Sequence, residues 1–236
     1  MAVDIGVITY NYPHLKTEQV VKALSKQDLH LTLFTLPFFP RTIRSCVFNH
    51  RPFQFNAISP HKLVRQVHAS ICECESDLDI YDGLDYYIIT GAGILSQKCL
   101  KEKKIINCHP GLLPISRGLD AFKWSVYNRI PIGNTLHFID KNIDEGQLIF
   151  RLPTAVYPDD TLETFAERHY QSEIQMLSDF MSYLNRSADS LDLSMFPREP
   201  AHRRMPKHIE RKMLEQFPTY KKMYQCESWH KAEKSG

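Results

Sequence analysis

Short apolar runs alternate with helix-like segments along the first part of the chain. The runs 4–10 and 30–36 are rich in β-branched and apolar residues and predict two strands. Between them, Val20, Val21 and Leu24 recur at helical spacing. A strand, a helix and a strand within about 35 residues have the size of a βαβ unit, which predicts parallel strands joined by a right-handed crossover.

The same alternation continues as far as residue 184. It predicts strands at 85–90, 104–108, 135–139 and 147–152, and helices at 60–72, 96–100, 120–128 and 160–184. The stretch 37–56 is rich in Pro, Arg and Phe and has no clear period. We therefore predict an α/β fold, with a Rossmann-like, mostly parallel twisted sheet flanked by helices.

The chain changes character after residue 184. Residues 185–206 contain several prolines and read as a linker, and 208–216 predict one more helix that Pro218 ends. We predict a catalytic domain over 1–184 and a short helical C-terminal extension over 185–236.

Composition narrows the class of protein further. The 236 residues are 43% apolar and 24% charged with a net charge of +2, so nothing in the overall charge favours nucleic acid or an anionic membrane. No apolar run is long enough to span a bilayer, and the first apolar stretch contains Asp4 without a preceding basic segment, so we expect a cytoplasmic protein. The cysteines lack zinc-site spacing and predict free thiols and no metal.

The polar residues with the most specific spacing follow a predicted strand. Asn107 and His109 are two positions apart, so their side chains point to the same face, and Pro110-Gly111 then turns the chain. Asp144 lies in a polar turn between two later predicted strands. An amide, an imidazole and a carboxylate that converge in a cleft suit acyl transfer to an amine without a covalent intermediate.

These residues also carry a resemblance. The sequence at 107–114, Asn-Cys-His-Pro-Gly-Leu-Leu-Pro, resembles the Asn-x-His-x-x-Leu-Leu-Pro signature of the folate-dependent formyltransferases. Gly-x-Thr-x-His-Phe at 133–138 and Ile-Asp-x-Gly at 143–146 are similar to a second block of that family, and Asp160-Thr161 before a long helix also fits. Several spaced blocks in the right order are more specific than one motif. Within the family, the chain looks most like the sugar N-formyltransferases.

The resemblance implies roles for the three polar residues. Asn107 would hydrogen-bond the formyl oxygen, His109 would stabilise the developing oxyanion, and Asp144 would tune His109 and take the proton of the attacking amine. Cys108 would face the core by strand alternation. His137 lies in the second block, where we expect a structural strand residue that could still approach the site.

The resemblance also implies a co-substrate, 10-formyltetrahydrofolate, and no metal. Its pterin would lie in a slot between two loops, with apolar walls and a few polar groups. The matching residues are Ala92, Gly93, Ile94, Leu95, Phe138, Ile139, Asp140, Asn142 and Ile143.

The acceptor amine is less well defined by the sequence. The loop after the first predicted strand has no glycine and therefore lacks the backbone phosphate cradle of some nucleotide-binding relatives. Side chains could take over that task, and an ordinary surface role for them is about as well supported. The candidates for substrate binding are Tyr10, Asn11, Tyr12, Lys16, Arg117 and Asp120.

Elimination leaves an amino sugar linked to a nucleotide as the favoured acceptor. Residues 185–236 are too few for the C-terminal barrel of the transformylases that act on methionyl-tRNA. Alternatives that stay open are glycinamide ribonucleotide as acceptor, a formyltetrahydrofolate hydrolase and a non-catalytic folate- or sugar-binding module. A nicotinamide oxidoreductase is disfavoured because no Gly-x-Gly-x-x-Gly follows the first strand. The phenylalanines of 37–55 leave a homodimer open.

Overall fold

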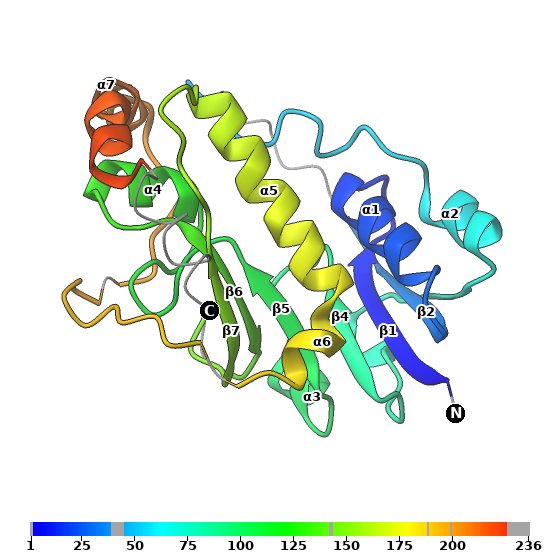
Figure 1. The fold of residues 1–236 in the computed structure, drawn as a ribbon. Helices are drawn as coiled ribbons and strands as arrows, with labels where there is room; N and C mark the ends of the chain where they lie inside the picture. The colour runs from blue at the N-terminus through cyan, green and yellow to red at the C-terminus, as the bar shows by residue number, and fades with distance from the viewer. Residues whose placement is uncertain (1, 39–44, 142–143, 188, 199, 226–236) are drawn as a thin grey trace.

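The computed structural model describes residues 2–38, 45–141, 144–187, 189–198 and 200–225. Its strands form one seven-stranded sheet in the order β3-β2-β1-β4-β5-β6-β7 (Figure 1). The first five strands of that order are parallel, whereas β6 is antiparallel to both β5 and β7. The predicted mostly parallel α/β sheet is therefore confirmed. The strands are β1 (Val3–Tyr10), β2 (Leu29–Leu36), β3 (Ser70–Glu73), β4 (Tyr86–Ile89), β5 (Ile105–His109), β6 (Gly133–Phe138) and β7 (Leu148–Pro153).

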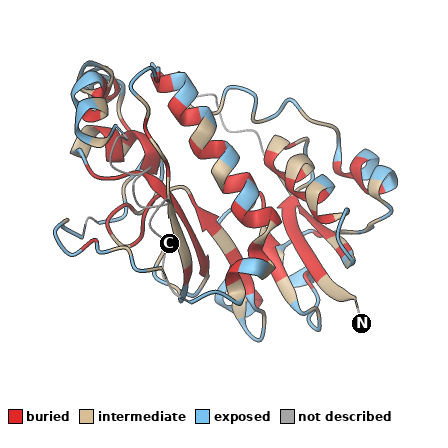
Figure 2. Cartoon of the chain, viewed as in Figure 1, coloured by how far each residue is buried: buried red, intermediate tan, exposed pale blue. Residues whose placement is uncertain are grey.

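Helices cover both faces of the sheet. Helices α1, α2 and α5 pack on one face, and their apolar residues share a core with Ile106 and Cys108 of β5. Helix α3 and the 3-10 turn η1 lie on the other face, where Cys99 and Ile80 share a second core with Ile105. Figure 2 shows the result, with buried strands between helices whose outer sides are exposed. The helical elements are α1 (Leu15–Leu24), α2 (Pro60–Val67), η1 (Asp77–Asp79), α3 (Gln97–Leu100), α4 (Ala121–Asn128), α5 (Leu162–Ser178), α6 (Phe180–Leu184) and α7 (Lys207–Tyr224).

The direction in which the chain fills the sheet reverses between β1 and β4. From β1 the chain crosses outward to β2 and β3, and from β4 it continues in the opposite direction, so the two strands form a topological switch point. The loops that follow them touch, because a Cβ on Gly91 would lie 2.8 Å from the ring of Tyr10. Buried hydroxyls connect the ends of the two strands to α1. Oγ1 of Thr17 lies 2.6 Å from Oγ1 of Thr9 and 3.0 Å from Oγ1 of Thr90.

Two predicted helices have different ends. The helix predicted at 60–72 ends at Val67, where His68 takes a left-handed conformation with φ 55°, and 70–73 instead form the edge strand β3 beside β2. Ile71 fits the spacing of a helix as well as that of a strand, and its pairing with Leu33 of β2 places it in a strand. The helix predicted at 160–184 is broken at Asp179 into α5 and α6.

The prediction that Pro218 ends the last helix is wrong. Helix α7 runs through Pro218 to Tyr224. The proline is exposed, whereas Phe217 and Tyr220 are buried in a core with Phe165 of α5 and Phe122 of α4. Burial of these aromatic rings outweighs the loss of one backbone hydrogen bond. The C-terminal extension thus shares a core with α4 and α5, and the division at residue 184 stays a prediction.

Candidate active site

Strand β5 presents Asn107 and His109 on the face of the sheet opposite α5. Ile106 and Cys108 point into the core with α1 and α5, so by alternation their neighbours project to the other side. Cys108 is accordingly a core residue, and burial raises the pKa of its thiol far above the ordinary range. Asn107 is half-buried and His109 is buried at the carboxyl end of the strand.

Both ring nitrogens of His109 face protein groups. Nε2 donates a hydrogen bond to the Ser116 carbonyl at 2.9 Å, since a carbonyl can only accept. Nδ1 lies 3.4 Å from Oδ1 of Asp144. The close packing under this ring requires Gly111, because a Cβ there would lie 2.8 Å from His109 Nε2 and from the Ser116 carbonyl oxygen.

The environment of His109 favours the neutral imidazole. Burial lowers the pKa of His109, and the Asp144 carboxylate and the Ser116 carbonyl only partly oppose that shift. In the neutral ring the proton stays on Nε2, so the Nδ1 lone pair faces a carboxylate oxygen. Two lone pairs 3.4 Å apart form a site that attracts one proton between them.

Asp144 is held from the side opposite His109. Its Oδ2 accepts a hydrogen bond of 2.9 Å from the Gly118 amide, and the neighbouring Glu145 pairs with Arg117 at 2.9 Å. The residue has a left-handed backbone with φ 55°. The predicted convergence of the β5 pair with Asp144 is therefore present, and the role of each residue in catalysis stays a prediction.

His137 joins this cluster, which the sequence suggested only weakly. From β6 its Nε2 lies 3.4 Å from Nδ2 of Asn107 and 4.0 Å from Oδ1 of Asp144. Its Nδ1 donates to the Phe138 carbonyl at 3.1 Å, which leaves Nε2 to accept from the Asn107 amide. Burial, followed by the nearby His109, lowers the pKa of His137 to about 4, so the ring is neutral at pH 7. The sequence signal for this position was its place in the second block of the family resemblance, where a structural strand residue was expected.

A cleft of about 460 Å³ opens beside Asp144 and His137. Leu113, Pro114 and Leu148 give it apolar walls. Its charged lining residues are of both signs: Arg117, Arg151 and Arg198, with the carboxylates of Asp144 and Glu145. Arg117 is paired with Glu145 at 2.9 Å and Arg151 with Asp189 at 2.7 Å. The cleft thus combines apolar walls with charged groups of both signs.

The residues predicted to hold a pterin lie in different environments, and their role stays a prediction. Leu95 is buried in one core with Ala92 and Ile139, whereas Ile94 is 87% exposed and Gly93 is also exposed. The amides of Phe138 and Ile139 bond the Gln147 and Ile105 carbonyls at 2.8 Å and 2.9 Å, so they are not free to read a heterocycle. Asp140 is exposed, and Asn142 and Ile143 lie outside the described residues.

The loop after β1 uses most of its polar groups within the protein. The Asn11 carboxamide oxygen accepts from the Phe38 amide at 2.9 Å, and the first amide of α1, at Leu15, donates to the Gln54 carbonyl at 2.8 Å. The rings of Tyr10 and Tyr12 pack on Phe38 with centroids 4.7 Å and 5.3 Å apart. This loop therefore presents aromatic rings rather than a free helix N-terminus.

Lys16 and Asp120 are engaged in ways that the sequence did not suggest. The Lys16 ammonium is buried and lies 2.6 Å from Oε1 of Glu173, which also pairs with Arg51. Burial opposes the charge on Glu173, but Arg51 and Lys16 outweigh it and lower the pKa of Glu173 to about 2. Asp120 accepts a hydrogen bond of 3.0 Å from the Met205 amide. Both side chains have structural partners and are not free for a substrate, whereas Arg117 lines the cleft.

Acid should destabilise the fold in a defined pH window. Burial lowers the pKa of His14, His137 and His169 to about 4 from 6.5, so these rings resist protonation in the folded state but not in the unfolded chain. The unfolded state then binds more protons between about pH 6.5 and 4, and the free energy of unfolding falls as the pH is lowered through that window. We expect the melting temperature to decrease steadily over it, measured by circular dichroism. His169→Gln should flatten the decrease and the exposed His61→Gln should not; a melting temperature that is constant across the window would contradict the assignment.

The fold is shared with known formyltransferases. A phosphoribosylglycinamide formyltransferase from Campylobacter jejuni subsp. jejuni is 17% identical with a TM-score of 0.57, over 78% of this chain and 98% of that one. A sugar N-formyltransferase from a Shewanella species is 19% identical with a TM-score of 0.53, over 90% of this chain and 87% of that one. At this identity the likeness concerns the fold alone.

Sequence relatives match over a shorter segment. The trifunctional purine biosynthetic protein adenosine-3 of Gallus gallus is 38% identical over 73 residues, which is 30% of this chain and 7% of that protein. Curated relatives of this kind are covered over 5% to 36% of their own length. The formyl transferase family model matches residues 54–181, which is more than half of the chain and includes the whole Asn107–Asp144 cluster. The chain therefore belongs to the formyl transferase family.

Proposed function

We propose that this chain transfers a formyl group from 10-formyltetrahydrofolate to a primary amine by direct attack of the amine. The observation that carries the proposal is the cluster in which His109 Nδ1 lies 3.4 Å from Asp144 Oδ1 while Asn107 meets His137. The cluster combines a proton-accepting pair, His109 and Asp144, with an amide donor, Asn107. A serine or cysteine nucleophile is not needed, because the substrate amine itself attacks the formyl carbon.

The described residues fit the proposed donor. Exposed Ile94, beside the buried Leu95 and the half-buried Ile139, supplies an apolar surface for a flat heterocycle. The neighbouring cleft offers an apolar wall to the aromatic part of a folate, and Arg198 at the same cleft suits its carboxylates, since Arg117 and Arg151 are paired with Glu145 and Asp189. When bound, the donor supplies an electrophilic formyl carbon attached to its N10 nitrogen.

The chain's own groups account for the proton and the developing charge. His137 accepts one hydrogen of the Asn107 amide, which directs the second toward a formyl oxygen. The amine forms the new C–N bond and gives its proton to the His109–Asp144 pair. The same proton is then available to the N10 nitrogen when the old C–N bond breaks. Since both nitrogens of His109 face protein groups, we assign the formyl oxygen to Asn107 rather than to His109.

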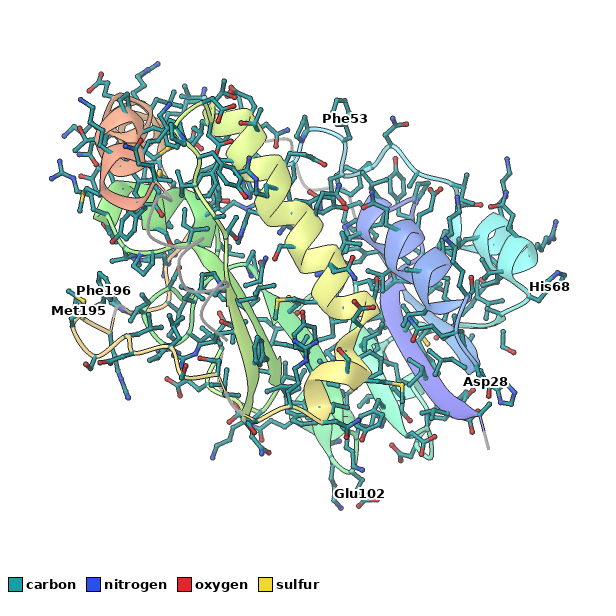
Figure 3. All side chains as sticks on the ribbon, in the orientation of Figure 1. Asp28, Phe53, His68, Glu102, Met195 and Phe196 are labelled. Carbon is teal, nitrogen blue, oxygen red and sulfur yellow. The ribbon has the colours of Figure 1, made fainter. Side chains whose placement is uncertain are left out.

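For the acceptor we propose an amino sugar linked to a nucleotide. Tyr12, Phe53 and Phe55 are 41%, 62% and 46% exposed, and Tyr12 and Phe55 pack on Phe38. Figure 3 shows Phe53 projecting from the loop above α1. Flat aromatic surfaces suit sugar and base rings, which supports this acceptor class. We further propose a cytoplasmic location, and a homodimer stays a prediction.

Glycinamide ribonucleotide is a second candidate acceptor. The curated relatives include phosphoribosylglycinamide formyltransferases of Bacillus subtilis and Haemophilus influenzae, 37% and 30% identical over 71 and 74 residues. Against it stand the engaged Lys16 ammonium and Leu15 amide, because a terminal phosphate is commonly held by such groups.

A substrate panel tests the proposal. The full chain is incubated with 10-formyltetrahydrofolate and with amino-sugar nucleotides or glycinamide ribonucleotide, and N-formyl product is detected by mass spectrometry. We expect product with an amino-sugar nucleotide; product from glycinamide ribonucleotide alone would replace the acceptor. Release of formate without any amine would identify a hydrolase. Folate binding without either product would identify a binding module and end the catalytic proposal.

A further inference from the structure

A segment of the C-terminal extension pairs with the loop that holds Asp144. Residues 201–205, here called the strap, run beside Arg117 and Gly118, and Gly118 forms a parallel bridge with His202. The His202 amide donates to the Arg117 carbonyl at 3.0 Å, and the Leu119 amide donates to the His202 carbonyl at 2.8 Å. These two backbone hydrogen bonds, here called the clamp, flank Gly118. The Gly118 amide in turn donates to Asp144 Oδ2 at 2.9 Å.

Gly118 is the residue that the clamp requires. Its φ is +84°, and a Cβ would lie 2.4 Å from the His202 carbonyl oxygen and 2.6 Å from the His202 nitrogen. A side chain at this position would have to push the strap away or turn the Gly118 peptide. Either movement would redirect the N–H that Asp144 accepts.

The strap itself is fastened at three further points. The rings of His202 and Trp124 are stacked with centroids 4.4 Å apart, and Trp124 Nε1 donates to the Arg203 carbonyl at 2.8 Å. The Met205 amide donates to the Asp120 carboxylate at 3.0 Å. Helix α7 then follows, where Glu210 forms a buried ion pair of 2.6 Å with Lys123 of α4. The strap therefore has a fixed position relative to the Asp144 loop.

We propose that the strap is a positioning element for the proton-accepting pair, acting through the His202 backbone on Gly118 and through Gly118 on Asp144. The inference rests on the proposed function. The Gly118 amide occupies Oδ2 of Asp144, which leaves Oδ1 toward Nδ1 of His109. Without the strap, the loop bearing Gly118 loses two backbone hydrogen bonds and the carboxylate is no longer held in that rotation. The backbone of residue 202, far from β5 in sequence, thus positions the Asp144 carboxylate for formyl transfer, whereas the His202 side chain packs on Trp124.

A pair of variants separates the clamp from mere packing. His202→Ala removes the ring that stacks on Trp124 but keeps the backbone amide, whereas His202→Pro removes the ring and also the N–H that bonds Arg117. We expect His202→Ala to retain kcat within about threefold while losing some stability. We expect His202→Pro to lower kcat by about tenfold or more, a loss comparable to that of one hydrogen bond to a charged group, with KM for donor and acceptor unchanged.

Gly118→Ala provides a second, independent variant with its own control. Gly83 also has positive φ, at +99°, but nothing lies within 4 Å of a Cβ built there. Gly83→Ala therefore carries the backbone strain without a clash and should keep the wild-type kcat. Gly118→Ala should lower kcat about tenfold or more at folded, soluble protein. Equal kcat values in Gly118→Ala, His202→Pro and wild type would overturn the inference.

Hydrogen exchange tests the clamp without reference to activity. In the wild-type chain the amides of Gly118 and Leu119 should be protected, and that protection should fall in His202→Pro but not in His202→Ala. An inactive wild type would refute the proposed function, and the exchange result would then still decide whether the clamp exists. Unchanged protection in His202→Pro, or lost protection with unchanged kcat, would overturn the positioning role.

Discussion

Asp144→Asn is expected to reduce formyl transfer by about 100- to 10,000-fold, which is the range for loss of general acid–base catalysis. The substitution keeps the shape of the side chain, and its carboxamide oxygen can still accept from the Gly118 amide. What it removes is the negative oxygen 3.4 Å from His109 Nδ1, so the amine proton no longer has a paired acceptor. The loss should appear in kcat, with KM for the folate donor little changed.

Donor binding and an exposed carboxylate provide the controls for this variant. The Asp144→Asn protein should bind a folate analogue with wild-type affinity, measured by isothermal titration calorimetry. Asp159→Asn changes an exposed carboxylate before α5 and should leave kcat within about twofold. Transfer at the full wild-type rate by Asp144→Asn would show that the His109–Asp144 pair is not the proton acceptor.

Glu173→Gln is expected to destabilise the fold by about 3–5 kcal/mol, as is usual when one partner of a buried ion pair is removed. Glu173 is 1% exposed and pairs with both Lys16 and Arg51. A neutral side chain of the same shape would leave two cations near each other with no buried counter-charge. Because these cations come from α1 and from the irregular stretch after β2, loss of the pair should also loosen that stretch.

Urea unfolding monitored by circular dichroism measures this change. Glu167→Gln alters an exposed carboxylate on the same helix and should change the free energy of unfolding by no more than about 0.5 kcal/mol. A Glu173→Gln variant as stable as wild type would mean that the ion pairs with Lys16 and Arg51 contribute nothing net.

Local patterns were sufficient for most of the elements and for the faces on which the β5 side chains lie. Apolar runs and helical spacing reflect which side of a segment is buried. The order of polar and apolar residues within that segment is enough to show it. The same alternation separated Asn107 and His109 from Cys108, which lies in the core. Local patterns predicted the wrong helix end in two places. Ile71 fits the spacing of a helix as well as that of a strand, and it lies in β3. Pro218 is tolerated inside α7 because the neighbouring aromatic rings are buried.

The sequence by itself determined the α/β class, the order of most elements and the three polar residues that meet at the end of β5. Only the tertiary structure decided which groups those residues face. His137 reaches Asn107 because β6 pairs with β5, and Lys16 meets Glu173 across 157 positions of chain. Gly118 receives the strap because α7 packs on α4. Such partners depend on the packing of distant elements, and no local spacing records it.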